Sequence, residues 1–421
     1  MIIQKEIAPG VTLRCCRDSR FKQGCLSFQL IRPMKKEEAA KNALLSSVLL
    51  RGTKHHPDLR SITEQLDTLY GASVSPLVRR IGDYQTVGFY CGFMDDRFAL
   101  PGDKVLEPML RFLEEILLDS PVENGGFRRC FVESEKKNLA ATIDAELNDK
   151  RAYANSQLLR TMCRRDSFGI PRLGEKEDVL AIDAAGLYRH YREILRESPI
   201  HVFYAGSADA EQVEALLRPI WQRLERCVQP LPPQTGFTPC EGKDVEETLE
   251  VSQGKLCIGY TTPVTNRDAD FPVMQVMNTI FGAGMTSKLF MNVRERLSLC
   301  YSVGSSYYGT KGIVLVSAGI DFDKEALTRQ EVENQLEACR RGEISDSELV
   351  SAKEALLSSL RATHDSPAAI EGYYATAALS GMKLSVDDYM AAVNAVTAEQ
   401  VAAAARKVQP HSSYFLKGEG Q

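Results

Sequence analysis

The order of hydrophobic and polar positions predicts a run of strands followed by helices at the start of the chain. Residues 2–8, 12–16 and 25–31 alternate or run apolar between turn residues, as pleated strands do. Residues 37–51 and 58–70 instead repeat apolar side chains at helical spacing. Strands that follow one another in sequence before the helices favour antiparallel pairing, with the helices on one face of the sheet.

A similar pattern recurs in the second half of the chain. Glu64 and Tyr70 lie 231 residues before Glu295 and Tyr301, and an apolar helical stretch precedes each pair. Two extended runs follow each pair: 75–80 and 85–93 in the first half, and 301–308 and 312–320 in the second. We therefore predict an α+β fold of two tandem homologous domains, each an antiparallel sheet with helices packed on one face.

A proline-rich stretch marks the boundary between the two predicted domains. Residues 229–245 contain four prolines, and an acidic run follows them. A segment so rich in proline can neither continue a helix nor pair in a central strand. We predict an N-terminal domain over 1–228, a linker over 229–245 and a C-terminal domain over 246–421.

Composition and charge exclude several classes of protein. The 421 residues are 44% hydrophobic and 25% charged, with a net charge of −5, so no strong basic field favours nucleic acid. No apolar run is long enough to cross a bilayer, and the start of the chain lacks a basic, apolar leader. The 11 cysteines are dispersed without a C-x-x-C pair, which indicates reduced thiols. We expect a cytoplasmic protein with neither nucleic acid nor a membrane as partner.

One segment carries a specific family signature. Residues 281–302 hold a glycine turn, small polar residues, an Arg-bearing helix and then Tyr-Ser. This segment resembles the second-domain motif of the insulinase-type zinc metallopeptidases, also called the pitrilysin or mitochondrial-processing-peptidase family. The resemblance covers nearly the whole chain as two family domains.

The catalytic residues of that family are missing from the matching positions. Active members carry H-x-x-E-H on the first helix, where two imidazoles bind zinc and the glutamate deprotonates its water. Counting back from Arg51-Gly52-Thr53 places Ala43, Ser46 and Ser47 at the three motif positions. The position that resembles the third ligand holds Thr142, beside Ala141. The resemblance thus predicts no metal and no catalytic residue in this chain alone.

The six histidines suggest no replacement site. Adjacent His55 and His56 cannot face one ion from a helix, and His190 stands beside a single carboxylate, Glu193, at helical spacing. We interpret His190 and Glu193 as a solvated helix face, and His201 as a core or edge histidine. His364 follows a predicted helix end.

The family's substrate-handling residues are retained. In the family, an Arg binds substrate carbonyls and a Tyr seven residues later stabilises an oxyanion. The matching positions are Arg294 and Tyr301, and the glycine turn matches Gly282 and Gly284. Arg offers several charged donors and Tyr a neutral one, which suits carbonyl recognition. The alternative is that Arg294 is a surface charge, that Tyr301 opens a strand, and that the glycines form a capping turn.

The resemblance therefore implies a non-catalytic, peptide-binding subunit. A zinc-bearing paralogous subunit would supply the metal and the base in a heterodimer, since two-domain members pair with their halves facing; a homodimer is the other arrangement. A scaffold or binding protein of the same fold, with no peptidase role and tied to peptide or elongation factor P modification, is the alternative function. An enzyme with a differently placed site is a third, and whether the chain alone has any activity is left open.

Overall fold

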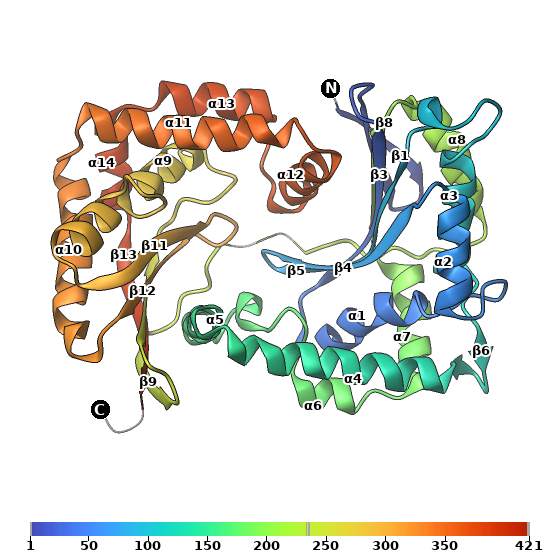
Figure 1. Cartoon of the computed structure of the whole chain (residues 1–421), viewed down its shortest axis with the longest axis horizontal. Coiled ribbons are helices and arrows are strands. Elements are labelled where there is room, and N and C mark those ends of the chain that lie inside the picture. The colour runs from blue at the N-terminus through green and yellow to red at the C-terminus, as the bar shows by residue number, and fades with distance from the viewer. Residues whose placement is uncertain (1, 233, 235, 419–421) are drawn as a thin grey trace. The chain divides into compact units, whose positions relative to one another are not determined.

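The computed structural model describes residues 2–232, 234 and 236–418. The chain forms two compact units (Figure 1), and each unit combines segments from both halves of the sequence. Unit 1 contains Met1–Asp144, Ile170–Pro233 and His364–Thr376, and unit 2 contains Ala145–Gly169, Gln234–Thr363 and Ala377–Gln421. In the described part of the predicted linker, no helix or strand precedes β9, which begins at Asp244.

Unit 1 is built on a six-stranded sheet in the order β1-β2-β8-β3-β5-β4. Its neighbouring strands are antiparallel except for β2 and β8, which are parallel. The antiparallel α+β class is confirmed, and the central position of β8 is an addition that strand patterns alone did not predict. The strands are β1 (Ile2–Ala8), β2 (Val11–Arg17), β3 (Gln23–Pro33), β4 (Ser73–Ile81), β5 (Tyr84–Met94) and β8 (Ile200–Gly206).

Helices cover one face of this sheet and form the main core of unit 1. Along β3, Leu26, Phe28 and Leu30 point into that core, and the residues between them point to the opposite face. The helices of unit 1 on the chain before residue 234 are α1 (Lys36–Leu49), α2 (Leu59–Thr68), α3 (Leu106–Leu118), α4 (Arg129–Ala145), α6 (Lys176–Leu180), α7 (Ala184–Glu197) and α8 (Ala210–Gln222), with a small hairpin of β6 (Val122–Glu123) and β7 (Gly126–Phe127).

The opposite face of the sheet receives the first part of α12 (Pro367–Ser380), a helix from late in the sequence. Its Glu371 is fully buried and accepts hydrogen bonds from Ser27 Oγ and Gln29 Nε2, both at 2.8 Å. Arg79 of β4 adds two charge-assisted bonds to the carboxylate at 2.8 and 2.9 Å. Ile370 packs beside them against Cys25 and its neighbours. This polar anchor fixes the start of α12 on unit 1.

Unit 2 has a five-stranded sheet in the order β11-β12-β10-β13-β9, with β13 and β9 parallel and the other pairs antiparallel. The strands are β9 (Asp244–Leu249), β10 (Gly254–Thr261), β11 (Cys300–Tyr308), β12 (Ile313–Ile320) and β13 (Gln409–Gly418). The helices that begin in unit 2 are α5 (Lys150–Met162), α9 (Phe271–Phe281), the π-helix η4 (Leu289–Arg296), α10 (Glu325–Arg341), α11 (Asp346–Thr363), α13 (Val386–Ala395) and α14 (Ala398–Arg406). Ser345 and Glu348 form a capping box at the start of α11.

Helix α5 comes from the first half of the sequence and packs on β10 and β13. Beyond its end, the Asp166 carboxylate lies 2.8 Å from the Nζ of Lys311, and both side chains are almost completely buried. The backbone N–H groups of Phe168 and Thr238 also donate to Asp166. Each sheet therefore carries a helix from the other half of the sequence, and a buried carboxylate paired with a basic side chain lies near each of these helices.

Candidate functional site

The four positions that match the zinc ligands and base carry no metal-binding group. Ala43 and Ser46 are buried on α1, at 4% and 1% exposed, and Ser47 is half-buried. Ser46 Oγ has no hydrogen-bond partner in the described part of the chain. Thr142 is exposed on α4 and donates to the carbonyl of Asn138 at 2.9 Å. None of these side chains offers the imidazole, thiolate or carboxylate of a zinc site, and none can act as the general base at neutral pH.

Among residues 2–232, 234 and 236–418, no group of three His, Cys, Asp or Glu side chains could hold a metal ion. The imidazoles make other contacts: His56 Nδ1 lies 2.9 Å from Glu115, and His411 Nε2 lies 2.9 Å from the carbonyl of Cys240. His201 lies in β8, where burial lowers its pKa to about 3.

His190 corrects one sequence interpretation. The prediction of a solvated helix face is wrong for this residue, because it is only 6% exposed and its Nε2 lies 2.6 Å from Asn42 Oδ1. Burial lowers the pKa of His190 to about 4. Glu193 is exposed, as predicted, and lies 3.4 Å from Arg32.

Tyr301 lies at an irregularity of the edge strand β11. The pairing of β11 with β12 shifts between Cys300 and Ser302, so Tyr301 falls out of register. Such bulges turn a side chain away from the regular pleat. Tyr301 is 62% exposed, and its hydroxyl donates to Asp321 Oδ1 at 3.1 Å. Lys324, 2.9 Å from the same carboxylate, and the Tyr301 hydroxyl together lower the pKa of Asp321.

Arg294 lies on the π-helix η4, a geometry that is frequent at functional sites. Its guanidinium stacks over the ring of Phe290, with 4.7 Å between the guanidinium carbon and the ring centroid, and it lies 3.7 Å from Glu295. The side chain is 42% exposed, so donors remain open to solvent. Burial raises the pKa of Cys300, the first residue of β11, to about 11, while the charges of Arg294 and Lys324 oppose this rise.

The glycine turn separates α9 from η4. A side chain at Gly282 would meet Ser305 Oγ at 2.6 Å, and the Gly282 carbonyl accepts from the Ser305 N–H at 2.9 Å. Gly284 has φ +144° with open space around it, a conformation that other residues rarely adopt. Gly282 thus allows close packing onto β11, whereas Gly284 shapes an exposed loop.

Large apolar side chains gather on the same segment. Met285, Met291, Leu297 and Tyr301 are 76%, 50%, 42% and 62% exposed. Such a run of exposed apolar groups beside Arg294 offers contacts for apolar side chains together with donors for carbonyl oxygens. The sequence analysis proposed Arg294 and Tyr301 but named neither Asp321 nor the exposed methionines. The pairing of β11 with β12 is needed to bring Asp321 to Tyr301.

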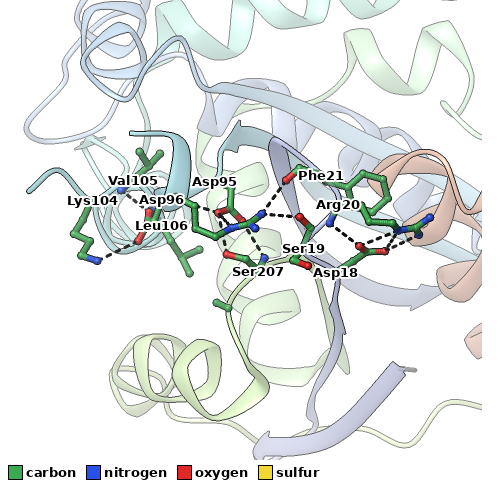
Figure 2. A network of polar contacts seen from close by, with 12 residues as sticks. Asp18, Ser19, Arg20, Phe21, Asp95, Asp96, Lys104, Val105, Leu106 and Ser207 are labelled. Carbon is green, nitrogen blue, oxygen red and sulfur yellow. Dashed lines mark hydrogen bonds and ion pairs between the residues drawn. The ribbon is translucent and has the colours of Figure 1, made fainter. Parts of the chain in front are cut away.

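A second polar cluster lies in unit 1 where β2, β5 and β8 end (Figure 2). Asp95 accepts bonds from Ser207 N and Oγ at 3.0 and 2.9 Å, and from Arg97 Nε at 2.8 Å. Burial raises the pKa of Asp95, but these bonds outweigh it and the pKa lies below its usual value. Asp96 receives the N–H groups that begin α3, and Asp18 pairs with Arg20. The three carboxylates accept hydrogen bonds from groups of this chain. We therefore interpret the cluster as a structural link between the ends of these strands.

Comparison with known proteins identifies the family of this chain. Residues 181–356 match the family described as the peptidase M16 inactive domain. The chain is 31% identical over 409 residues to the probable inactive metalloprotease YmfF of Bacillus subtilis, covering 97% of this chain and 96% of that protein. The chain belongs to the M16 peptidase family. It is a homologue without the zinc motif of the insulinase-type metallopeptidases that the sequence resembles.

Solved structures share the M16 fold over the whole chain. A conserved protein from Enterococcus faecalis has a TM-score of 0.91 at 26% identity, covering 100% of this chain and 99% of that one. A peptidase M16 inactive domain from Pseudomonas fluorescens has a TM-score of 0.80 at 16% identity, covering 99% and 98%. No helix in the described part of this M16 chain is long and apolar enough to span a membrane.

Proposed function

We propose that this M16 homologue is the non-catalytic, peptide-binding subunit of a heterodimeric metallopeptidase. The zinc ion and the base belong to a paralogous subunit in this proposal, and the present chain contributes Arg294 and Tyr301. The chain itself needs no cofactor, and we place the complex in the cytoplasm, where thiols stay reduced.

One observation carries the proposal. Arg294 on η4 and Tyr301 at the start of the edge strand β11 remain partly open to solvent amid exposed apolar side chains, while the zinc-motif positions on α1 hold no ligand. A guanidinium can donate to the carbonyls of an extended peptide, and a phenol can donate to an oxygen that gains charge.

The contact of Tyr301 in the free chain defines how its hydroxyl must move when a substrate binds. Tyr301 donates to Asp321 in the free chain, so its hydroxyl must turn from that carboxylate toward the substrate oxygen. Tyr70 occupies the corresponding place in the sequence repeat and also donates to an aspartate, Asp103, but it additionally accepts from the N–H of Leu100. Tyr70 therefore joins two parts of unit 1, whereas Tyr301 has one partner that can be exchanged.

The test is to mix this chain with a zinc-bearing M16 protein encoded in the same genome and to measure peptide cleavage. Tyr301→Phe and Arg294→Ala should each lower kcat/KM of the complex about 10- to 100-fold, as the loss of one oxyanion or carbonyl donor does. Arg296→Ala is the matched control, because Arg296 is more exposed and lies 3.7 Å from Glu331 on α10. It should leave cleavage unchanged.

A scaffold role gives a different result. In that case the two chains still bind each other, but Arg294→Ala and Tyr301→Phe change nothing in the assembled complex. No association and no change in cleavage would contradict a heterodimeric peptidase outright, and a self-associated chain in size-exclusion chromatography would identify a homodimer. A link to elongation factor P modification would then be tested by binding of that protein to the purified chain.

A further inference from the structure

Three polar side chains lie next to one another on the face of the unit 1 sheet that receives the start of α12. Thr12 and Arg14 come from β2, and His201 comes from β8. Their strand neighbours point into the main core on the other face: Val11, Leu13 and Cys15 on β2, and Ile200, Val202 and Tyr204 on β8. Because side chains alternate along a strand, Thr12, Arg14 and His201 point away from that core. Cys16 and Phe203, which point the same way, pack with the start of α12.

The pairing of β2 with β8 brings the three side chains together. Thr12 lies directly opposite His201, and Arg14 lies two residues further along β2. Paired strands lie about 4.8 Å apart and residues two apart on a strand about 6.6 Å, so the side chain of Arg14 is long enough to reach the space beside Thr12 and His201. Burial and the charge of Arg14 together lower the pKa of His201 to about 3, so its imidazole is neutral at physiological pH.

None of these three side chains has a hydrogen-bond or ion-pair partner within residues 2–232, 234 and 236–418. All three are half-buried, and their polar atoms remain accessible from the surface. Burial alone lowers the pKa of Arg14 to about 10, and no described carboxylate opposes this change. A cation that loses water without gaining a partner costs free energy, so Arg14 is a guanidinium that lacks an anion.

Arg226 shows a guanidinium of the same unit that has its partners. Burial also lowers its pKa to about 10, but its nitrogen atoms donate to the carbonyls of Pro9, Leu195 and Ser198 at 3.0, 2.7 and 2.6 Å. The alternative for Arg14 is a stem that covers the sheet while the charged head stays in water. The lowered pKa argues against this, because a fully hydrated head would keep its ordinary pKa.

The acidic side chain of β1 on this face, Glu6, turns away from Arg14. Glu6 lies opposite Thr12 in the pairing of β1 with β2, and its carboxylate accepts from the N–H of Gly10 at 3.0 Å. Gly10 precedes β2, on the far side of Thr12 from Arg14. Gln4 lies directly opposite Arg14 and is exposed. Beside Arg14, β1 therefore presents an amide and no carboxylate.

We propose that Thr12, Arg14 and His201 form a binding site for a carboxylate group. The guanidinium holds the two carboxylate oxygens through paired N–H donors, while the Thr12 hydroxyl and the single N–H of the neutral His201 imidazole donate to the same oxygens. One fixed positive charge matches the single negative charge of a carboxylate. A phosphate group carries close to two negative charges at neutral pH and would call for a second cation. The site lies on unit 1 and does not rest on the proposed role of Arg294 and Tyr301.

The first test measures the reactivity of Arg14 in the full chain. Phenylglyoxal, a dicarbonyl, modifies guanidinium groups that have lost their proton, and peptide mapping by mass spectrometry gives the rate at each arginine. Arg14 should be modified, whereas Arg226, held by three carbonyls, should not. Acetyl-Gly-Glu-Gly-amide at about ten times its dissociation constant should slow the modification of Arg14 about tenfold, by mass action. Acetyl-Gly-Gln-Gly-amide should leave the rate unchanged.

The second test measures the affinity of the same glutamate peptide by isothermal titration calorimetry. Arg14→Gln should weaken binding about tenfold or more, and Thr12→Val about three- to tenfold, because hydrogen bonds to a charged group are the stronger ones. Arg17→Gln is the matched control, since Arg17 is exposed at the end of the same strand and is not on the proposed face. It should bind as the unaltered chain does. Thermal melting of each variant separates lost binding from lost folding.

Acetyl-Gly-Gly-Gly and acetate distinguish the sources of the carboxylate, which are a peptide side chain, a peptide C-terminal end and a free small acid. Tighter binding of any one of them supports the site and identifies its source. Three results would overturn the proposal: no protection of Arg14 by any carboxylate, equal binding of the glutamate and glutamine peptides, or equal affinity of Arg14→Gln and Arg17→Gln. Tighter binding of inorganic phosphate than of every carboxylate would also overturn it.

Discussion

At the scale of the residue, His190 shows how surroundings set the charge of one side chain. Burial lowers its pKa from about 6.5 to about 4; Glu38 opposes that change, while Lys41 and Arg32 add to it. Between those pH values the unfolded chain holds more protons than the folded one, so acid favours unfolding. This shift is worth about 3 kcal/mol. The stability advantage over His190→Gln at pH 7.5 should therefore shrink by about that amount at pH 4, as measured by urea unfolding.

The comparison with His190→Gln matters because many carboxylates also titrate in this range. Subtracting the two unfolding curves leaves the contribution of His190, since glutamine does not titrate. Parallel curves for the two proteins from pH 7.5 to 4 would show that His190 is not held neutral by its neighbours.

A second prediction at this scale concerns the buried pair of Asp166 and Lys311. Burial raises the pKa of Asp166, but the bonds from Lys311 and from the N–H of Phe168 outweigh it and lower the pKa. Removing the charge by Asp166→Ala leaves a fully buried ammonium without its carboxylate. We expect unit 2 to lose about 3–5 kcal/mol of unfolding free energy in chemical denaturation. Combining it with Lys311→Met should restore most of that loss; a double variant as unstable as the single one would contradict this account.

At the scale of the element, α12 depends on a single buried carboxylate. Glu371→Ala leaves the buried Gln29 amide and the partly exposed Arg79 guanidinium without their shared acceptor, and the start of α12 should loosen from unit 1. Hydrogen exchange measured by mass spectrometry should show faster exchange over 366–376.

The neighbouring position provides the opposite change. A methyl group added at Gly372 would meet open space, with no atom outside the helix's own backbone within 4 Å, so alanine fits there. Gly372→Ala should slow exchange over the same segment and raise stability by about 0.5–1 kcal/mol, because alanine favours helix. Unchanged exchange over 366–376 in Glu371→Ala would mean that Glu371 does not hold α12.

The elements differ in how far sequence alone predicts them. Period and turn residues predict α1, α9 and β11 because each signal lies within the segment itself. They do not predict that β8 lies between β2 and β3, since pairing partners are set by contacts far apart in the sequence. His190 was misjudged for the same reason: Asn42 and Gln85, which bury and orient it, come from other elements. Arg294 and Tyr301 were proposed from a motif, whereas the contact of Asp321 with Tyr301 required the structure.

At the scale of the whole molecule, the two compact units do not coincide with the two halves of the sequence, because each unit includes a segment from the other half. Unit 1 includes His364–Thr376 from the second half, and unit 2 includes Ala145–Gly169 from the first. Cutting the chain at its proline-rich stretch therefore does not separate two complete units. A fragment of residues 1–228 lacks Glu371 and keeps α5 without the strands on which it packs.

This division predicts that fragments 1–228 and 246–421 do not fold properly alone. In each fragment, one helix (α5 or α12) lacks the sheet on which it packs, and one sheet lacks the helix that covers it. Each fragment should therefore bind a dye for exposed apolar surface and unfold without a cooperative transition. When the two fragments are co-expressed, they should elute together in size-exclusion chromatography and unfold cooperatively. The control is the full chain with a protease site placed at 236–240: after cleavage its halves should stay together in size-exclusion chromatography, because α5 and α12 still lie on the sheets of the other half. Either fragment alone giving a sharp transition and no dye binding would show that the exchanged helices are dispensable.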